Sequence, residues 1–241
     1  MPRANRYFLP GHIWHITHRC HKQQFLLKFA KDRRMWRYWL YQARRRYGLC
    51  VLNYIVTSNH IHLLVRDRGH GEIADSMQLI AGRVAQQFNR RKSRKGAYWE
   101  DRYHATAVQA DGHLARCMVY IDLNMVRAGA VDHPSDWIHA GYNEIQLLPD
   151  RYRCIDVPAL RTLLGFSDTN DLRTGLRGWV DAALAQGGTK RQPEWTRSIA
   201  VGQREFLDAL GRKLKVTHPG CEIKGEGEHL YLRETPGVYL Y

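Results

Sequence analysis

Two histidines separated by one residue are the first feature of the sequence that could do chemistry. His60 and His62 lie in the run His-Ile-His-Leu-Leu-Val-Arg at 60–66, and such a run predicts a β-strand. Alternate side chains of a strand share a face, so both imidazoles project to one side while Ile61 points toward the core. Two imidazoles in this arrangement can bind one metal ion. A half-buried histidine pair without a metal is the alternative.

A helix farther along the chain combines a phenol with groups that bind metals and phosphates. The helix is expected from Asp111 to about residue 127, and one of its stripes carries Arg116, Tyr120, Asn124 and Arg127 at spacings of four, four and three. Asn124 could give an oxygen ligand beside two imidazoles, and either arginine could hold a phosphate. Tyr120 is therefore a candidate nucleophile. The alternative is a tyrosine that only packs against a neighbour.

The net charge indicates a polyanionic partner. The chain has 37 Lys and Arg against 23 Asp and Glu, which gives a net charge of +14 and a pI near 9.8. Nucleic acid is the usual partner of such an excess, particularly where cations alternate with aromatic side chains, as they do in this chain. The alternative is a protein that is merely basic.

The elements that must position these side chains follow from hydrophobic periodicity and turn signals. A polar pair, Ser58-Asn59, between two apolar runs predicts a tight antiparallel hairpin. The character of the sequence changes near 145–155, which suggests a domain boundary. The expected strands cover 12–18, 50–57, 60–66 and 103–109, and the expected helices cover 31–47, 72–91, 111–127, 170–186 and 203–215.

Cysteine usage and hydropathy place the protein in a cytoplasm without a membrane role. The cysteines are five, scattered, and without a Cys-x-x-Cys pair, which argues against a zinc ribbon and a disulfide scaffold and favours a reducing compartment. The first residues lack the apolar region of a signal peptide, and no apolar run is long enough to span a bilayer.

Three segments in order resemble the single-tyrosine HUH transposases. The segment 59–65 (Asn-His-Ile-His-Leu-Leu-Val) resembles the family's His-hydrophobic-His motif, and 120–129 (Tyr-Ile-Asp-Leu-Asn-Met-Val-Arg-Ala-Gly) resembles its tyrosine helix. The segment 96–103 (Gly-Ala-Tyr-Trp-Glu-Asp-Arg-Tyr) matches a further family segment. The resemblance covers roughly residues 5–145 and favours the branch of REP-associated tyrosine transposases. Ser58 and Met125 stand where the family commonly has proline.

The resemblance implies a fold, a domain order and a metal. It implies an α+β domain with an antiparallel sheet backed by helices, of the ferredoxin-like HUH kind, over residues 1–148. Beyond the resemblance, periodicity and composition predict a helical extension over 149–216 and an acidic, tyrosine-rich tail over 217–241. Mg²⁺ or Mn²⁺ would be held by His60, His62 and Asn124, whereas imidazoles alone would suggest zinc or another transition metal.

The resemblance also implies a reaction. Tyr120 would attack a phosphodiester of single-stranded DNA near an imperfect hairpin, forming a 5′-phosphotyrosine that a second strand resolves. Two alternatives remain, namely a domesticated DNA- or RNA-binding protein without catalysis and a metal-dependent nuclease that uses water. The sequence leaves monomer or homodimer open. The expected DNA-binding residues are Arg83, Arg90, Arg91, Lys92, Arg94, Lys95, Tyr98, Trp99, Arg102, Arg116 and Arg127. For Trp99, core packing is an equal alternative.

Overall fold

A computed structural model describes residues 9–149, 151–187, 190–215, 220–227 and 229–234. Its strands are β1 (Ile13–Arg19), β2 (Cys50–Val56), β3 (His60–Arg66), β4 (His104–Val108), β5 (Ala200–Val201), β6 (Cys221–Lys224) and β7 (Tyr231–Glu234). Its α-helices are α1 (Ala30–Tyr47), α2 (Glu72–Arg91), α3 (Gly112–Asp122), α4 (Asn124–Arg127), α5 (Gly141–Leu147), α6 (Val157–Leu164), α7 (Thr169–Ala185), α8 (Glu194–Arg197) and α9 (Arg204–Lys215). Two short 3₁₀ turns cover His21–Gln23 and Pro134–Asp136.

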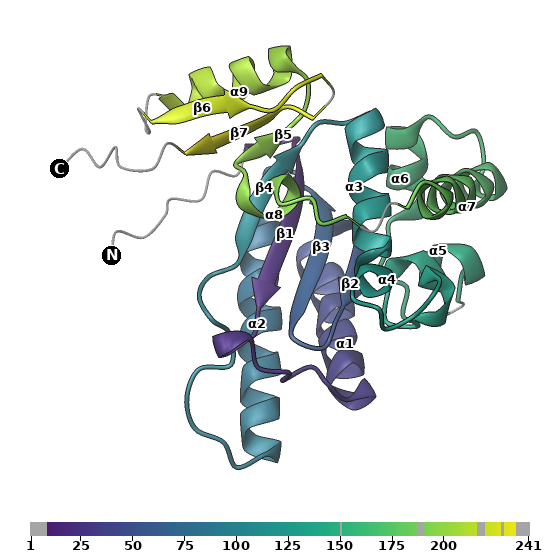
Figure 1. The fold of residues 1–241 in the computed structure, drawn as a ribbon. Coiled ribbons are helices and arrows are strands. Elements are labelled where there is room, and N and C mark those ends of the chain that lie inside the picture. Colours follow the sequence, from purple (N-terminus) through teal and green to yellow (C-terminus); the bar gives the residue numbers. More distant parts are fainter. Residues whose placement is uncertain (1–8, 150, 188–189, 216–219, 228, 235–241) are drawn as a thin grey trace.

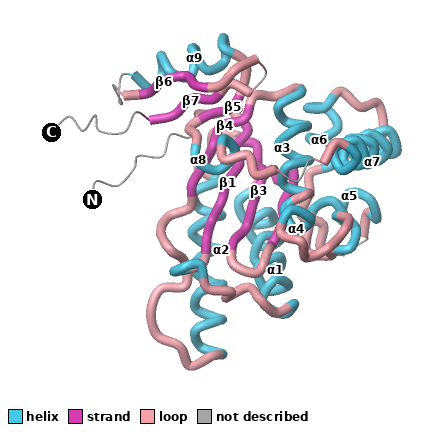
Figure 2. The backbone as a smooth tube through the Cα atoms, in the orientation of Figure 1, coloured by secondary structure: helices cyan, strands magenta, loops and turns pink. Residues whose placement is uncertain are grey.

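The described strands form one sheet in the order β2-β3-β1-β4-β5-β7-β6. Every neighbouring pair is antiparallel except β4 and β5, which are parallel. Helices lie against both faces, as Figure 1 and Figure 2 show. The expected α+β class with a largely antiparallel sheet backed by helices is confirmed.

The hairpin between β2 and β3 forms as the polar pair predicts. Ile61, Leu63 and Val65 are fully buried, because alternate side chains of β3 face the helices behind the sheet. At the end of the preceding helix, Gly48 takes the left-handed conformation with φ of 71°, which a residue with a side chain adopts only at a cost. The hairpin thereby brings His60 to the first position of β3.

The two faces of the sheet are covered by different helices. Helices α1 and α2 pack on each other behind the sheet, and α3 and α8 lie in front of it in the view of Figure 1. Strand alternation agrees with this division, since His15 and His18 of β1 point to opposite faces. His15 bonds to residue 195 in α8, whereas His18 stacks on Trp99, whose indole donates to the Ala81 carbonyl of α2.

The helix expected from 111 to 127 is divided in two. Asp111 caps its start by accepting from the backbone N–H of His113, as the sequence predicts. At Leu123 the backbone leaves helical values with ψ of 3°, and the Leu123 side chain is buried with Tyr142 and Val180. Tyr120 therefore lies in the last turn of α3, which ends at Asp122, and Asn124 begins α4.

The segments after residue 149 extend the sheet. Strand β5 joins the edge of β4, and the hairpin of β6 and β7 continues the sheet beyond it. Helix α9 packs against these strands. The segment from 217, expected as a tail, thus supplies two strands, while residues 235–241 lie outside the described part. None of the described helices has the length and apolar character needed to cross a bilayer. All five cysteines are free thiols.

Candidate active site between strand β3 and helices α3 and α8

The two histidines of β3 lie on the face that α3 and α8 cover. His60 is partly exposed and His62 is only 2% exposed. In the antiparallel register of β1 and β3, Thr17 lies opposite His62 and Arg19 lies opposite His60. The imidazole rings of His60 and His62 have their centres 5.0 Å apart. His60 and His62, the pair predicted from the sequence, therefore lie on one face of the sheet, where β3 begins and β1 ends.

Tyr120 and Asn124 lie beside His62. The centre of the Tyr120 ring is 5.8 Å from that of the His62 ring, with the two planes nearly perpendicular. The Asn124 amide nitrogen donates to His62 Nε2 over 3.0 Å. Tyr120 is 6% exposed, and its ring also faces His15 at 6.1 Å. The structure thus brings together the phenol, both imidazoles and the amide that the sequence singled out.

Arg127 contacts Tyr120 directly. Its guanidinium carbon lies 4.2 Å from the centre of the Tyr120 ring, and its Nη2 donates to the Tyr120 carbonyl over 2.6 Å. A cation over a π-face is attracted to it. Arg116, on the same predicted stripe, is half-buried on α3.

Hydrogen bonds orient the His60 ring. Asn59 donates its amide N–H to the Gln23 carbonyl, so its Oδ1 is free to accept from His60 Nδ1 at 2.7 Å. Thr57 donates its hydroxyl to the His60 carbonyl and leaves its oxygen 3.0 Å from the same Nδ1. Both partners offer acceptors, so Nδ1 carries the proton and Nε2 keeps its lone pair.

Two residues of the site escaped sequence reasoning, His15 on β1 and Trp195 on α8. His15 is fully buried, with Nε2 2.8 Å from His62 Nδ1 and Nδ1 2.8 Å from the Trp195 carbonyl oxygen. The Trp195 ring lies 6.2 Å from that of Tyr120. The alternation of the 12–18 strand could have placed His15 on the site's face, but the sequence offered no signal for Trp195.

Burial and nearby cations keep the histidines neutral. Burial lowers the pKa of His15 to about 3 and that of His60 to about 4, and it lowers the pKa of His62 further below its usual value. Arg19, Arg127 and Arg191 act in the same direction on His60. Burial raises the pKa of Tyr120, and Arg127 opposes this rise. Neutral imidazoles are the form that binds metals.

The donor set suits a divalent metal ion. His60 and His62 each have an Nε2 lone pair, and Asn124, whose amide already touches His62, offers an oxygen after rotation of its amide. Two imidazoles and one neutral oxygen fit Mn²⁺ or a similar ion better than Mg²⁺, which favours oxygen ligands. Among the described residues, no group of three or more His, Cys, Asp or Glu side chains gathers as an alternative site.

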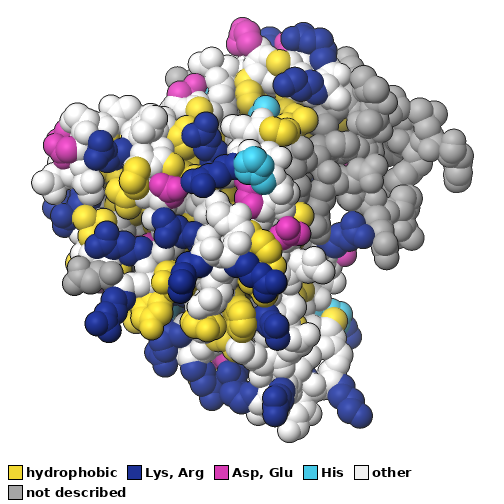
Figure 3. Space-filling model, turned by 180° about the vertical axis from the view of Figure 1, so that it is seen from behind, with side chains coloured by type: hydrophobic (Ala, Val, Ile, Leu, Met, Phe, Trp, Pro, Cys, Tyr) yellow, Lys and Arg dark blue, Asp and Glu magenta, His cyan; other side chains and the backbone are white. Residues whose placement is uncertain are grey.

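The remaining predicted DNA-binding residues lie on α2 and on the loop that follows it. Arg83, Arg90 and Arg91 belong to α2 on the other face of the sheet. Lys92, Arg94, Lys95 and Arg102 lie on the loop between α2 and β4, and this loop reaches β1, since Glu100 N–H donates to the Arg19 carbonyl. Figure 3 shows that Lys and Arg side chains spread over the rear face between hydrophobic patches. The exposed side chains of α1, of α2 and of the residue after α2 include Arg34, Tyr38, Arg45, Arg46, Arg83, Arg90 and Lys92.

Arg91, Tyr98 and Trp99 have partners within the protein. Arg91 forms an ion pair with Asp32, which is fully buried. Tyr98 is 2% exposed and donates to the Leu26 carbonyl, so its ring belongs to the core and not to the exposed stacking surface expected from the sequence. Trp99 is half-buried, with its ring stacked on His18. For Trp99, the packing alternative describes the observed arrangement.

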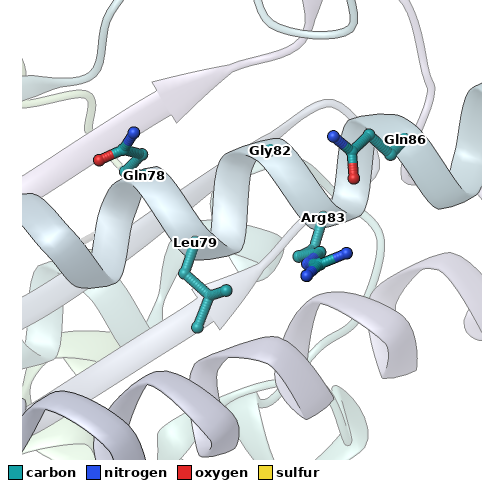
Figure 4. Close-up of a pocket in the computed structure, with 5 residues that line it drawn as sticks. All are labelled: Gln78, Leu79, Gly82, Arg83 and Gln86. Carbon is teal, nitrogen blue, oxygen red and sulfur yellow. The ribbon is translucent and has the colours of Figure 1, made fainter.

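A shallow depression on α2 lies apart from the site. Figure 4 shows its lining residues along one side of α2, above α1. Arg83 also stacks over the Trp39 ring there at 5.5 Å. Because α2 covers the face of the sheet opposite to α3, the depression has no contact with Tyr120. Its lining residues are Gln78, Leu79, Gly82, Arg83 and Gln86.

Solved structures with related folds include a transposase. A structure described as a REP-associated tyrosine transposase bound to a REP hairpin has 20% sequence identity and a TM-score of 0.52, over 64% of this chain and 90% of that chain. A putative transposase from Deinococcus radiodurans R1 has 17% identity and a TM-score of 0.36, over 50% of this chain and 96% of that chain. The first of these supports the fold. No curated protein sequence matches the chain significantly.

The sequence itself matches a known protein family. Residues 10–124 match the family model described as IS200-like transposase, a range that begins before β1 and ends at Asn124. It contains His15, His60, His62 and Tyr120, while the segment carrying Trp195 lies outside it. Residues 10–124, slightly under half of the chain, are therefore similar to the IS200-like transposases, and the resemblance in the motifs is confirmed.

Proposed function

We propose that this transposase cleaves and rejoins single-stranded DNA through a covalent link between Tyr120 and a 5′-phosphate. The observation that supports this most is the position of the Tyr120 ring beside His62 and under Arg127. A phenol, two imidazoles whose Nε2 atoms carry lone pairs and a guanidinium converge on one face of the sheet. The solved relative bound to a REP hairpin makes single-stranded DNA next to such hairpins the substrate to test first.

In the proposed reaction, the Tyr120 oxygen attacks a backbone phosphorus. The P–O3′ bond breaks, the upstream strand leaves with a 3′-hydroxyl, and the downstream strand stays on Tyr120 as a 5′-phosphotyrosine. The phosphodiester energy is retained, so attack by another 3′-hydroxyl can rejoin strands without ATP. Arg127 stabilises negative charge near the phenol oxygen and the phosphate. Arg19, opposite His60 in the register, is placed to bind the neighbouring phosphate.

A divalent metal would complete the site. His60 and His62 would hold it through Nε2, and Asn124 through its amide oxygen. When bound, such an ion polarises a non-bridging phosphate oxygen and orients the scissile bond. Burial of Tyr120 also means that a substrate strand must reach a phenol that is 6% exposed, so DNA binding is expected to be coupled to a local displacement around the site.

The test is a covalent adduct assay. Single-stranded DNA flanking a hairpin is labelled at one end or the other, incubated with the protein and Mn²⁺, and resolved on a denaturing gel. A 5′-phosphotyrosine keeps the 3′-end label on the protein and frees the 5′-end label on a fragment with a 3′-hydroxyl. Tyr120→Phe should abolish the adduct. Tyr152→Phe is the matched control, because Tyr152 is 64% exposed and belongs to none of the elements around the site.

The two alternatives give other results in the same assay. A water-dependent nuclease releases both fragments free, and Tyr120→Phe still cuts. A binding protein without catalysis retards the DNA on a native gel and leaves it intact with either label. Either result overturns the proposal.

A further inference from the structure

A chain of three hydrogen bonds, two of them buried and one partly buried, connects the C-terminal segment to the metal-binding side of His62. It runs from the Trp195 carbonyl to His15 Nδ1 (2.8 Å), from His15 Nε2 to His62 Nδ1 (2.8 Å), and from His62 Nε2 to the Asn124 amide (3.0 Å). His15 is 0%, His62 2% and Trp195 3% exposed. The rings of His15 and His62 are stacked, with an angle of 14° between their planes. Such a connection holds each ring in one orientation.

The Trp195 carbonyl, as the first acceptor, fixes the donor and acceptor in each of the following hydrogen bonds. A carbonyl oxygen can only accept, so His15 Nδ1 must carry a proton. His15 is fully buried, and its two ring nitrogens face a carbonyl and an imidazole, so its ring is neutral and Nε2 must be an acceptor. His62 Nδ1 therefore donates to it. A neutral His62 has one ring proton, and this hydrogen bond requires it on Nδ1. Nε2 therefore keeps the lone pair that a metal needs.

We infer that the Trp195 carbonyl, acting through His15, is a positioning device that holds His62 in the metal-binding tautomer. This inference rests on the proposed function for the role of the metal, but the tautomer follows from the hydrogen bonds alone. Partners that orient a ligating histidine from behind contribute to metal affinity as the ligands do. His15 and Trp195 would touch neither metal nor DNA and would act only through His62.

The C-terminal segment is built to hold the Trp195 carbonyl in place. Helix α8 packs on β1 and β4, and the Ser198 carbonyl accepts from Thr106 Oγ1 at 2.7 Å. Two residues later, β5 pairs with β4. The carbonyl is thus fixed between a buried indole and a strand of the same sheet. A chain ending at Asn124, where the family match ends, would leave the His15 N–H without this acceptor.

The tautomer is measured directly in the metal-free protein. Long-range ¹H–¹⁵N correlation spectra of ¹⁵N-histidine-labelled full-length chain at neutral pH distinguish the two neutral forms, and His62→Gln assigns the signals. We expect Nδ1-protonated His62 and Nδ1-protonated His15. An Nε2-protonated His62 in the unaltered protein overturns the inference, whatever the fate of the variants.

Variants of His15 and Trp195 test whether this chain of hydrogen bonds affects metal binding by His62. His15→Phe keeps a ring and removes the acceptor, so His62 should show mixed tautomers and Mn²⁺ affinity, measured by electron paramagnetic resonance, should fall ~10-fold or more. His15→Gln offers an amide oxygen to His62 and should recover part of the affinity, which also decides the matter if His15→Phe does not fold. Trp195→Phe keeps the backbone carbonyl and should preserve the tautomer. His139→Gln, a buried histidine on another element, is the matched control.

The outcomes separate this inference from the proposed function. If both His15 variants keep the His62 tautomer and the Mn²⁺ affinity of the unaltered protein, the positioning role of His15 is refuted, even if the Tyr120 adduct forms. Conversely, the His62 tautomer and the Mn²⁺ affinity could depend on His15 in a protein that forms no adduct. That result would support the positioning role of His15 and refute only the transfer reaction.

Discussion

The guanidinium of Arg127 lies 4.2 Å from the centre of the Tyr120 ring and donates to the carbonyl oxygen of the same residue. One side chain therefore holds both the ring and the backbone of the candidate nucleophile at the end of α3. Together with Arg191, which has a smaller effect, it also opposes the rise in the pKa of Tyr120 caused by burial. Positioning and charge stabilisation come from one group.

Arg127→Gln should lower the rate of adduct formation ~10²-fold, the usual effect of removing one charge-stabilising donor. Arg127→Lys should restore little, because an ammonium lacks the planar fork that reaches ring and carbonyl together. Single-turnover kinetics with saturating DNA measures the effect. Arg90→Gln, an exposed change on α2, is the control for loss of general DNA affinity. A rate within twofold of the unaltered protein would contradict the role of Arg127.

Metal removal should stop adduct formation and leave DNA binding. EDTA is expected to abolish the adduct, and Mn²⁺ should restore it at a lower concentration than Mg²⁺, since two of the three ligand atoms are imidazole nitrogens. His60→Ala should remove the response to both ions, while the retardation of DNA on native gels persists because the phosphate contacts remain. Activity in EDTA equal to that in Mn²⁺ would exclude the metal site.

The site residues that local sequence patterns predict differ from those that only the three-dimensional fold brings together. His60 and His62 share a face because a strand repeats every two residues, so local periodicity predicts that pair. The 3.6-residue repeat of a helix predicts Tyr120 and Asn124 on one stripe, and both lie beside His62 although the helix divides at Leu123. His15 and Trp195 meet through strand register and a contact between residues 180 positions apart, which no local pattern encodes. The burial of the Tyr98 ring has the same kind of cause, since it comes from packing against Phe88 of α2 and from the hydrogen bond to Leu26.

A buried amide anchors the tyrosine helix to the edge of the sheet. Asn53 on β2 donates to Asp122 Oδ1 at 2.9 Å and accepts from the backbone N–H of Tyr54 at 2.8 Å. Asn53→Ala should lower the free energy of unfolding by ~1–3 kcal/mol, because it leaves buried polar groups without partners. Urea unfolding measures this loss. Gly141→Ala should give a comparable loss, since a Cβ there would lie 2.2 Å from Asn53 Oδ1 and 3.1 Å from the Tyr54 nitrogen.

A buried histidine outside the site should make stability sensitive to mild acid. Burial, with Arg33 and Arg37 nearby, lowers the pKa of His139 to about 4. The folded protein therefore keeps His139 neutral while the unfolded chain takes up a proton near pH 6.5. Its contribution to stability is present above pH 6.5 and is lost as the pH falls toward 4.

Replacing this histidine should flatten that dependence. Between pH 6.5 and 5, the free energy of unfolding of His139→Gln should fall less steeply than that of the unaltered protein, by up to ~1.4 kcal/mol per pH unit. Chemical denaturation at a series of pH values gives both slopes, and other buried histidines cancel in the comparison. Parallel slopes would mean that His139 does not titrate in this window.

Two neighbouring arginines on α2 allow a matched test of which cations bind DNA and which stabilise the fold. Both residues are exposed, but only Arg91 is ion-paired with fully buried Asp32 among the described contacts. Arg91→Gln should lower the free energy of unfolding by ~3–5 kcal/mol, because it leaves a buried carboxylate without its partner. Arg90→Gln should leave stability within ~0.5 kcal/mol. If α2 contacts the substrate, Arg90→Gln should instead reduce the salt dependence of single-stranded DNA affinity by ~0.7 in the log–log slope. An unchanged slope for Arg90→Gln would place the DNA entirely on the face that carries Tyr120.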